Sequence, residues 1–107
     1  MIRYIRSMRS VRGKGGKAIN YAVEIAEFLN AKYPEIQLSV FTSRFGPVND
    51  IYWYADAEDL AVLDQWQKKV GADPGYRELR QKAADLFIQD SGKDEVLSAI
   101  TTRKGPF

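Results

Sequence analysis

The order of hydrophobic patterns along the chain predicts an α+β fold. Apolar and polar residues alternate over residues 2–11, which is the period of a half-buried strand. Over residues 17–33 the period becomes that of an amphipathic helix, and residues 51–55 form an apolar run with three consecutive aromatic residues that is typical of a strand. Two further helical segments and a short apolar segment follow. The predicted order is strand–helix–strand–strand–helix–helix–strand.

The first strand and the first helix are separated by glycines. In the strand, residues 2–11, alternation places four side chains on one face: Ile2, Tyr4, Arg6 and Met8. A glycine-rich turn at residues 13–16 ends the strand. The helix at residues 17–33 carries an apolar stripe at helical spacing: Ala18, Ala22, Ile25, Ala26 and Leu29. Pro34 ends this helix, because the residue before a proline disfavours the helical conformation.

The middle of the chain is predicted to form two strands joined by a turn. The second strand covers residues 36–45, and residues 46–50 have the Gly, Pro, Asn and Asp content of a turn. The third strand covers residues 51–55. Asp56 is predicted to cap the following helix, which ends at Gly71.

The last third of the chain completes the unit. Asp73 and Pro74 are predicted to begin a third helix, the aspartate as its N-cap and the proline in its first turn. The last strand is predicted over residues 95–102. We expect a single domain over residues 1–102 and a flexible tail over residues 103–107. This order is that of a split β-α-β, ferredoxin-like unit, whose four strands form an antiparallel sheet with the helices on one face.

Composition excludes several classes of function. The 107 residues include no cysteine and no histidine, which excludes disulfides, thiolate nucleophiles, imidazole bases and histidine-ligated haem or zinc. The net charge of +2 is too small to indicate a nucleic-acid or membrane partner. No apolar run approaches the roughly 20 residues of a membrane span, and arginines interrupt the first residues where a secretory signal would be apolar. We therefore predict a cytoplasmic protein with no metal and no cofactor.

The glycine-rich turn resembles a phosphate-binding loop only in part. It precedes a predicted helix, whose first N–H groups attract anions. Val11 and Ala18, however, stand where a Walker A loop has glycine and Ser/Thr. We therefore interpret residues 13–17 as a strand–helix turn.

Four arginines, at positions 3, 6, 9 and 12, indicate ion pairs rather than a nucleic-acid surface. A spacing of three sends successive arginines of a strand to opposite faces, so they form no single basic stripe. No RNA-recognition motif accompanies them. We expect them to pair with acidic side chains.

The predicted sheet is apolar on both faces. In the third strand Trp53 lies on one face, whereas Tyr52 and Tyr54 lie on the other. Helices cover only one face of a small open sheet, and exposing aromatic residues on the second face to water is unfavourable. We therefore expect a homodimer through the open sheet face, a ligand cavity, or both.

Taken as a whole, residues 1–102 resemble the dimeric α+β barrel superfamily, which includes antibiotic-biosynthesis monooxygenases and NIPSNAP proteins. The resemblance lies in the element order, the aromatic third strand that ends in Ala55-Asp56, the helix that contains Trp66, and the Asp73-Pro74-Gly75-Tyr76 segment after it. It implies two sheets packed face to face in a dimer, with a pocket between each sheet and its helices. It further implies that any activity is that of a cofactor-independent monooxygenase, isomerase or cyclase. The lack of histidine departs from the haem-handling members.

These observations predict a protein that binds a small hydrophobic or aromatic metabolite. The side chains expected to line its pocket are Tyr4, Arg6, Met8, Phe41, Tyr52, Tyr54 and Trp66. Arg6 would orient the ligand through a charge-assisted hydrogen bond. Two alternatives stay open. The first is a non-catalytic structural or interaction protein of the same fold, and the more distant one is a nucleic-acid-binding ferredoxin-like domain. The sequence does not decide whether the protein is an enzyme, and it names no catalytic residue.

Overall fold

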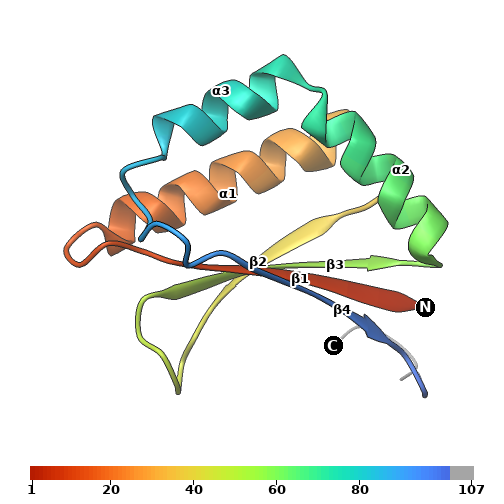
Figure 1. Ribbon diagram of the computed structural model, residues 1–107, viewed down its shortest axis with the longest axis horizontal. Coiled ribbons are helices and arrows are strands. Elements are labelled where there is room, and N and C mark those ends of the chain that lie inside the picture. Colours follow the sequence, from red (N-terminus) through yellow and green to blue (C-terminus); the bar gives the residue numbers. More distant parts are fainter. Residues whose placement is uncertain (102–107) are drawn as a thin grey trace.

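The computed structural model describes residues 1–101 and has the predicted order of strands and helices (Figure 1). The elements are β1 Ile2–Arg9, α1 Gly15–Lys32, β2 Leu38–Thr42, β3 Asp50–Ala57, α2 Leu60–Gly71, α3 Pro74–Lys82 and β4 Lys93–Ser98. The tail predicted for residues 103–107 lies outside the described residues.

The four strands form one antiparallel sheet in the order β2-β3-β1-β4, and the three helices all lie on one face of it (Figure 1). The two central strands, β1 and β3, are therefore the first and third in the sequence, as in a ferredoxin-like unit. The α+β class, the four-stranded antiparallel sheet and the ferredoxin-like order are thus confirmed. Within residues 1–101 no helix is both long enough and apolar enough to cross a membrane.

Strand pairing decides which side chains face the helices. In the β1–β3 ladder Tyr4 is opposite Ala55, and Arg6 is opposite Trp53. Because side chains alternate along a strand, the even-numbered residues of β1 share the helix-covered face with the odd-numbered residues of β3. Tyr52 and Tyr54 consequently lie on the uncovered face.

The core lies between the sheet and the helices, and α1 contributes the stripe that its sequence predicts. Its buried residues are Ala18, Ala22, Ile25, Ala26 and Leu29. Ala18 and Ala22 are completely buried, and such small side chains let the helix backbone approach the sheet closely. The Trp53 indole N–H donates to the Ala22 carbonyl oxygen at 3.3 Å, which gives a buried polar atom its partner.

The start of α2 corrects the sequence prediction. Strand β3 continues to Ala57, so Asp56 lies in the strand, where its carboxylate accepts two hydrogen bonds from Arg3 at 2.8 and 3.0 Å. The N-cap is instead Asp59, whose Oδ1 accepts from the Val62 backbone N–H at 3.0 Å. Either aspartate could act as an N-cap, but Asp56 is paired with Arg3 across the sheet, so Asp59 caps the helix.

Three strands are also shorter or displaced relative to prediction. Strand β1 ends at Arg9 rather than at residue 11. Strand β2 covers Leu38–Thr42 rather than residues 36–45, and β4 covers Lys93–Ser98 rather than residues 95–102. Helix α3 ends at Lys82, and the segment after it turns back toward β1, where Phe87 forms an isolated bridge with Ser10.

A buried carboxylate joins the end of α1 to the start of α3. Asp73 is the predicted N-cap of α3, and its Oδ1 accepts from the Tyr76 backbone N–H at 3.1 Å. Its Oδ2 accepts from the Tyr33 hydroxyl at 2.5 Å and pairs with the Lys32 ammonium at 2.6 Å. The Asp73 side chain is only 1% exposed. The carboxylate therefore fixes the position of α3 over the sheet.

Candidate functional site

A cavity of about 840 Å³ lies between the helix-covered face of the sheet and the three helices. All three helices, the central strands and the segment after α3 contribute to it. Its apolar and aromatic lining comprises Tyr4, Met8, Tyr21, Ile25, Leu29, Leu38, Trp53, Trp66, Val70, Tyr76, Ala83, Ala84, Phe87 and Ile88. Its polar lining comprises Arg6, Gln67, Arg77, Arg80, Gln81, Gln89, Asp90 and Asp94. An apolar interior with a few polar groups is the usual composition of a small-molecule site.

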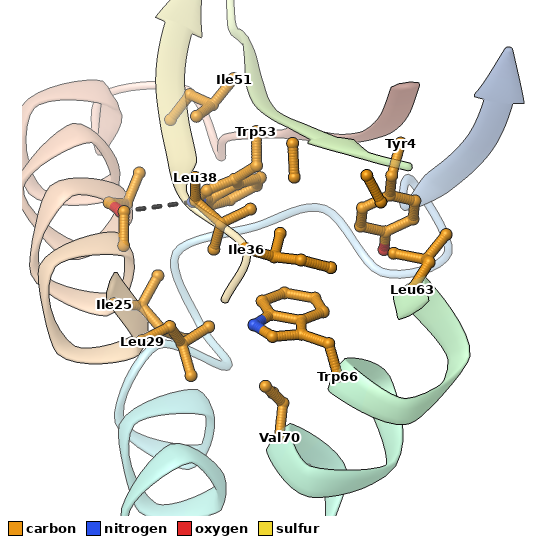
Figure 2. Close-up of a cluster of buried hydrophobic side chains, with 14 of the residues drawn as sticks. Tyr4, Ile25, Leu29, Ile36, Leu38, Ile51, Trp53, Leu63, Trp66 and Val70 are labelled. Atoms are coloured by element: carbon orange, nitrogen blue, oxygen red, sulfur yellow. Dashed lines mark hydrogen bonds between the residues drawn. The ribbon is translucent and has the colours of Figure 1, made fainter. Parts of the chain in front are cut away.

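Figure 2 shows the cluster of buried hydrophobic side chains, part of which lines the cavity, and Trp66 of α2 extends into this cluster. Its indole lies between Ile36 and Val70, and its nitrogen is on the side of α1, where Ile25 and Leu29 project. The Trp66 Nε1 atom is buried and has no hydrogen-bond partner among residues 1–101. A buried N–H without an acceptor costs roughly 1–3 kcal/mol.

Arg6 and Asp94, together with the Tyr4 hydroxyl, form a cluster of polar side chains on the sheet side of the cavity. The two residues are directly opposite each other on β1 and β4, and Arg6 Nη1 lies 3.1 Å from each Asp94 carboxylate oxygen. The Tyr4 hydroxyl donates to the same carboxylate at 3.1 Å. Burial alone would lower the pKa of Arg6, but Asp94 and Tyr4 together raise it. Burial, and then the Asp94 charge, raise the pKa of Tyr4, so both groups keep their protons at neutral pH.

The helix side of the cavity carries a second polar group, formed by Tyr21 of α1 with Tyr76 and Arg80 of α3. The Tyr21 ring packs edge-on against Phe87 with centroids 5.7 Å apart, and the Arg80 guanidinium carbon lies 5.6 Å from the centroid of the Tyr76 ring. Burial raises the pKa of Tyr21 to about 12, and Arg80 and Arg6 act in the opposite direction. The Tyr21 phenol is therefore a hydrogen-bond donor at neutral pH and a poor general base.

The structure brings together four of the seven residues predicted from the sequence. Tyr4, Arg6, Met8 and Trp66 line the cavity. The other three, Phe41, Tyr52 and Tyr54, lie on the opposite face of the sheet and do not line it. The single predicted pocket is corrected to this extent because the strand register, which the sequence pattern does not give, places Trp53 rather than Tyr52 and Tyr54 on the same face as Tyr4 and Arg6.

The three residues on the uncovered face form an aromatic cluster of their own. Phe41 packs edge-on against Tyr54 with centroids 4.9 Å apart, and the rings of Tyr52 and Tyr54 stack at 6.3 Å. Phe41 is 47% exposed. This aromatic surface is separate from the cavity.

Sequence reasoning missed Tyr21, Arg80 and Asp94 as lining residues. Tyr21 flanks the apolar stripe of α1, and Arg80 follows Tyr76 by one helical turn, so a helical projection could have placed both beside the core. Asp94 had no local signal, because its role follows from its cross-strand pairing with Arg6.

The other motifs have structural roles. Three of the four arginines pair with carboxylates as expected: Arg3 with Asp56 at 2.8 Å, Arg6 with Asp94 at 3.1 Å and Arg9 with Asp50 at 3.0 Å. The fourth, Arg12, forms no ion pair with the residues that the structure describes. The glycine-rich turn leads into α1, and its Lys14 binds the Asp85 carboxylate at 3.2 Å. Within residues 1–101, no cluster of three acidic side chains is arranged to hold a metal ion.

An antiparallel four-stranded sheet with helices on one face defines a class of small α+β proteins. Solved structures of this class superpose on nearly the whole chain. An uncharacterised NIPSNAP domain protein from Burkholderia xenovorans has a TM-score of 0.79 at 15% identity, with 100% of both chains covered. A NIPSNAP family protein of unknown function from Agrobacterium tumefaciens has a TM-score of 0.72 at 22% identity, covering 99% of this chain and 92% of that one.

The same fold occurs in antibiotic biosynthesis monooxygenases. SnoaB, a cofactor-independent oxygenase from Streptomyces nogalater, has a TM-score of 0.70 at 14% identity, with 97% of each chain covered. No protein-family model matches the chain, and no curated protein matches its sequence. The protein therefore has the fold that NIPSNAP domain proteins share with an antibiotic biosynthesis monooxygenase and with SnoaB.

Proposed function

We propose that the protein binds a small, largely apolar or aromatic molecule in the cavity between its sheet and its helices. The observation that carries this proposal is the cavity itself, about 840 Å³ in volume and lined mainly by aromatic and aliphatic side chains. A space of this size suits a molecule of two or three fused or linked rings, within the usual range of small-molecule sites of roughly 300–1,000 Å³.

The polar groups of the cavity favour binding over acid–base catalysis. The Asp94 carboxylate is engaged by Arg6 and Tyr4, and the Tyr21 phenol has a pKa of about 12. A general base works best when its pKa lies near the working pH, which the Tyr21 phenol does not provide, and the Asp94 carboxylate already accepts hydrogen bonds from Arg6 and Tyr4. The likeness to SnoaB, a cofactor-independent oxygenase, supports oxygenation of the bound molecule as the second candidate.

We further propose that two copies associate through the uncovered sheet face. Ile5, Phe41, Tyr52, Tyr54 and Leu97 present apolar and aromatic side chains there by strand alternation. Leu97 is 48% exposed and Phe41 is 47% exposed in the single chain. Contiguous apolar surface of this kind is typical of an interface. The face-to-face sheets of the dimeric α+β barrel superfamily support the same assembly.

Titration with N-phenyl-1-naphthylamine tests the binding proposal. This neutral two-ring dye fluoresces strongly in an apolar environment, and we expect saturable binding with one molecule per chain. Ala84 is exposed and lines the cavity, so Ala84→Trp should occlude it and lower the affinity by about tenfold or more, equivalent to about 1.4 kcal/mol.

A matched control separates occlusion from a general effect of tryptophan. Ala31 is an exposed alanine on α1 that does not line the cavity, so Ala31→Trp should leave dye binding unchanged. Circular dichroism and thermal melting would establish that both variants fold. Equal affinities of wild type and Ala84→Trp would refute the proposed site.

A further inference from the structure

We infer that Arg80 binds an acidic group of the cavity's ligand, which makes the ligand class an organic anion with an apolar or aromatic body. The inference rests on the proposed function, since it assigns the chemistry of a ligand in that same cavity. It differs from the sequence prediction, in which Arg6 was the cation that orients the ligand.

The charges around the cavity leave Arg80 as the available cation. Three arginines and two aspartates line the space: Arg6, Arg77, Arg80, Asp90 and Asp94. Arg6 already shares both oxygens of Asp94, and the Arg77 Nε–H donates to the Gly71 carbonyl oxygen at 3.0 Å. Arg80 forms no ion pair and no hydrogen bond with any side chain or backbone group of residues 1–101.

The surroundings of Arg80 suit an oxyanion attached to an aromatic body. Its guanidinium stays beside the Tyr76 ring, 5.6 Å from the centroid, through a cation–π contact that leaves its N–H groups able to donate. The Tyr21 hydroxyl, which also lacks a hydrogen-bond partner within residues 1–101, lies close enough for the Arg80 charge to affect its pKa. A neutral phenol and a guanidinium that line one cavity supply the donors that a carboxylate, sulfonate or phenolate oxygen accepts.

The apolar lining next to these donors favours an apolar or aromatic body for the rest of the ligand. Phe87 packs against Tyr21, and Ile25 and Leu29 continue the lining along α1. A molecule with its acidic group at Arg80 and its rings against these side chains would satisfy both parts of the cavity. The alternative role of Arg80 is that of an exposed, solvated arginine on α3.

Two dyes that differ by one sulfonate distinguish these roles. 8-Anilinonaphthalene-1-sulfonate is N-phenyl-1-naphthylamine with a sulfonate added, so the ratio of their affinities isolates the contribution of the anion. We expect the wild type to prefer the sulfonate. Arg80→Gln should lower the affinity for the anionic dye by about tenfold or more and leave the neutral dye unaffected, since a hydrogen bond to a charged group has about this effect.

Lys82→Gln is the matched control, because Lys82 lies on the same helix, carries the same charge and does not line the cavity. Arg80→Lys, which keeps the charge, should retain part of the preference. If Lys82→Gln reduces anion binding as much as Arg80→Gln does, or if the wild type shows no preference, the inference is wrong while neutral-dye binding still supports the cavity. If neither dye binds, the proposed function and the inference both fail.

Discussion

Asp73 is the residue whose environment departs most from that of an ordinary surface carboxylate. Hydrogen bonds from Lys32 and Tyr33 hold the pKa of Asp73 well below its usual value of 3.8, against the effect of burial. The same carboxylate caps α3 through the Tyr76 N–H. One side chain thus connects the end of α1, the start of α3 and the helix layer that covers the cavity.

This arrangement predicts a specific acid sensitivity. A carboxyl group with a lowered folded-state pKa stabilises the fold above its unfolded pKa, and this contribution is lost as the pH falls toward the folded value. Asp73→Asn should therefore lower the melting temperature at pH 7, and the difference from wild type should narrow as the pH falls from about 5 to about 2. Thermal melts across this range test it. A constant difference at every pH would show that the charge of Asp73 is not responsible.

At the scale of an element, two glycines occupy the second position of their helices with opposite constraints. Gly75 is second in α3, and a Cβ there would lie 2.9 Å from Phe28 Cζ and 3.1 Å from Asp73 Oδ1. Gly16 is second in α1, and a Cβ there would meet no atom within 4 Å. The close packing of α3 against α1 therefore leaves no room for a Cβ at position 75, whereas position 16 has room for one.

Alanine substitutions should separate the two sites. Gly16→Ala should raise the free energy of unfolding by about 0.5–1 kcal/mol, because alanine restricts the unfolded chain and favours the helix. Gly75→Ala should instead lower it by about 1–3 kcal/mol, the usual cost of overpacking. Urea denaturation of the two variants measures both values. A stabilised Gly75→Ala variant would mean that Phe28 moves aside freely.

The elements themselves were largely predictable, because periodicity is a local property. The buried stripe of α1 was read directly from its spacing, and Asp73 with Pro74 marked the start of α3 correctly. The choice between Asp56 and Asp59 as the cap of α2 was not local, since it depended on the pairing of Asp56 with Arg3 across the sheet.

The candidate site was predictable only in part for the same reason. Alternation correctly grouped Tyr4, Arg6 and Met8 on one face of β1. Which residues of β3 share that face follows from the register between strands, and the partner of Arg6 follows from the pairing of β1 with β4. These pairings join residues that are far apart in the sequence, so no local pattern predicts them.

At the scale of the whole molecule, the sheet separates two surfaces with different proposed roles. The helix-covered face forms the cavity, and the uncovered face carries the aromatic cluster of Phe41, Tyr52 and Tyr54. Ion pairs border this cluster on β1 and β3, where Arg3 binds Asp56 and Arg9 binds Asp50. An apolar centre with a charged rim is the usual anatomy of an interface.

The dimer proposal predicts that a charge within this cluster dissociates the protein without closing the cavity. Phe41→Glu would place an unpaired carboxylate between two sheets, at a cost of several kcal/mol by order of magnitude. Leu60→Glu is the control, because Leu60 is 61% exposed at the start of α2, on the helix side of the molecule. Sedimentation velocity at micromolar concentration should give a dimer for wild type and Leu60→Glu and a monomer for Phe41→Glu. A monomeric wild type would refute the assembly.

Because the cavity lies on the other face of the sheet, a folded Phe41→Glu monomer should still bind N-phenyl-1-naphthylamine, which would show that the two faces act independently.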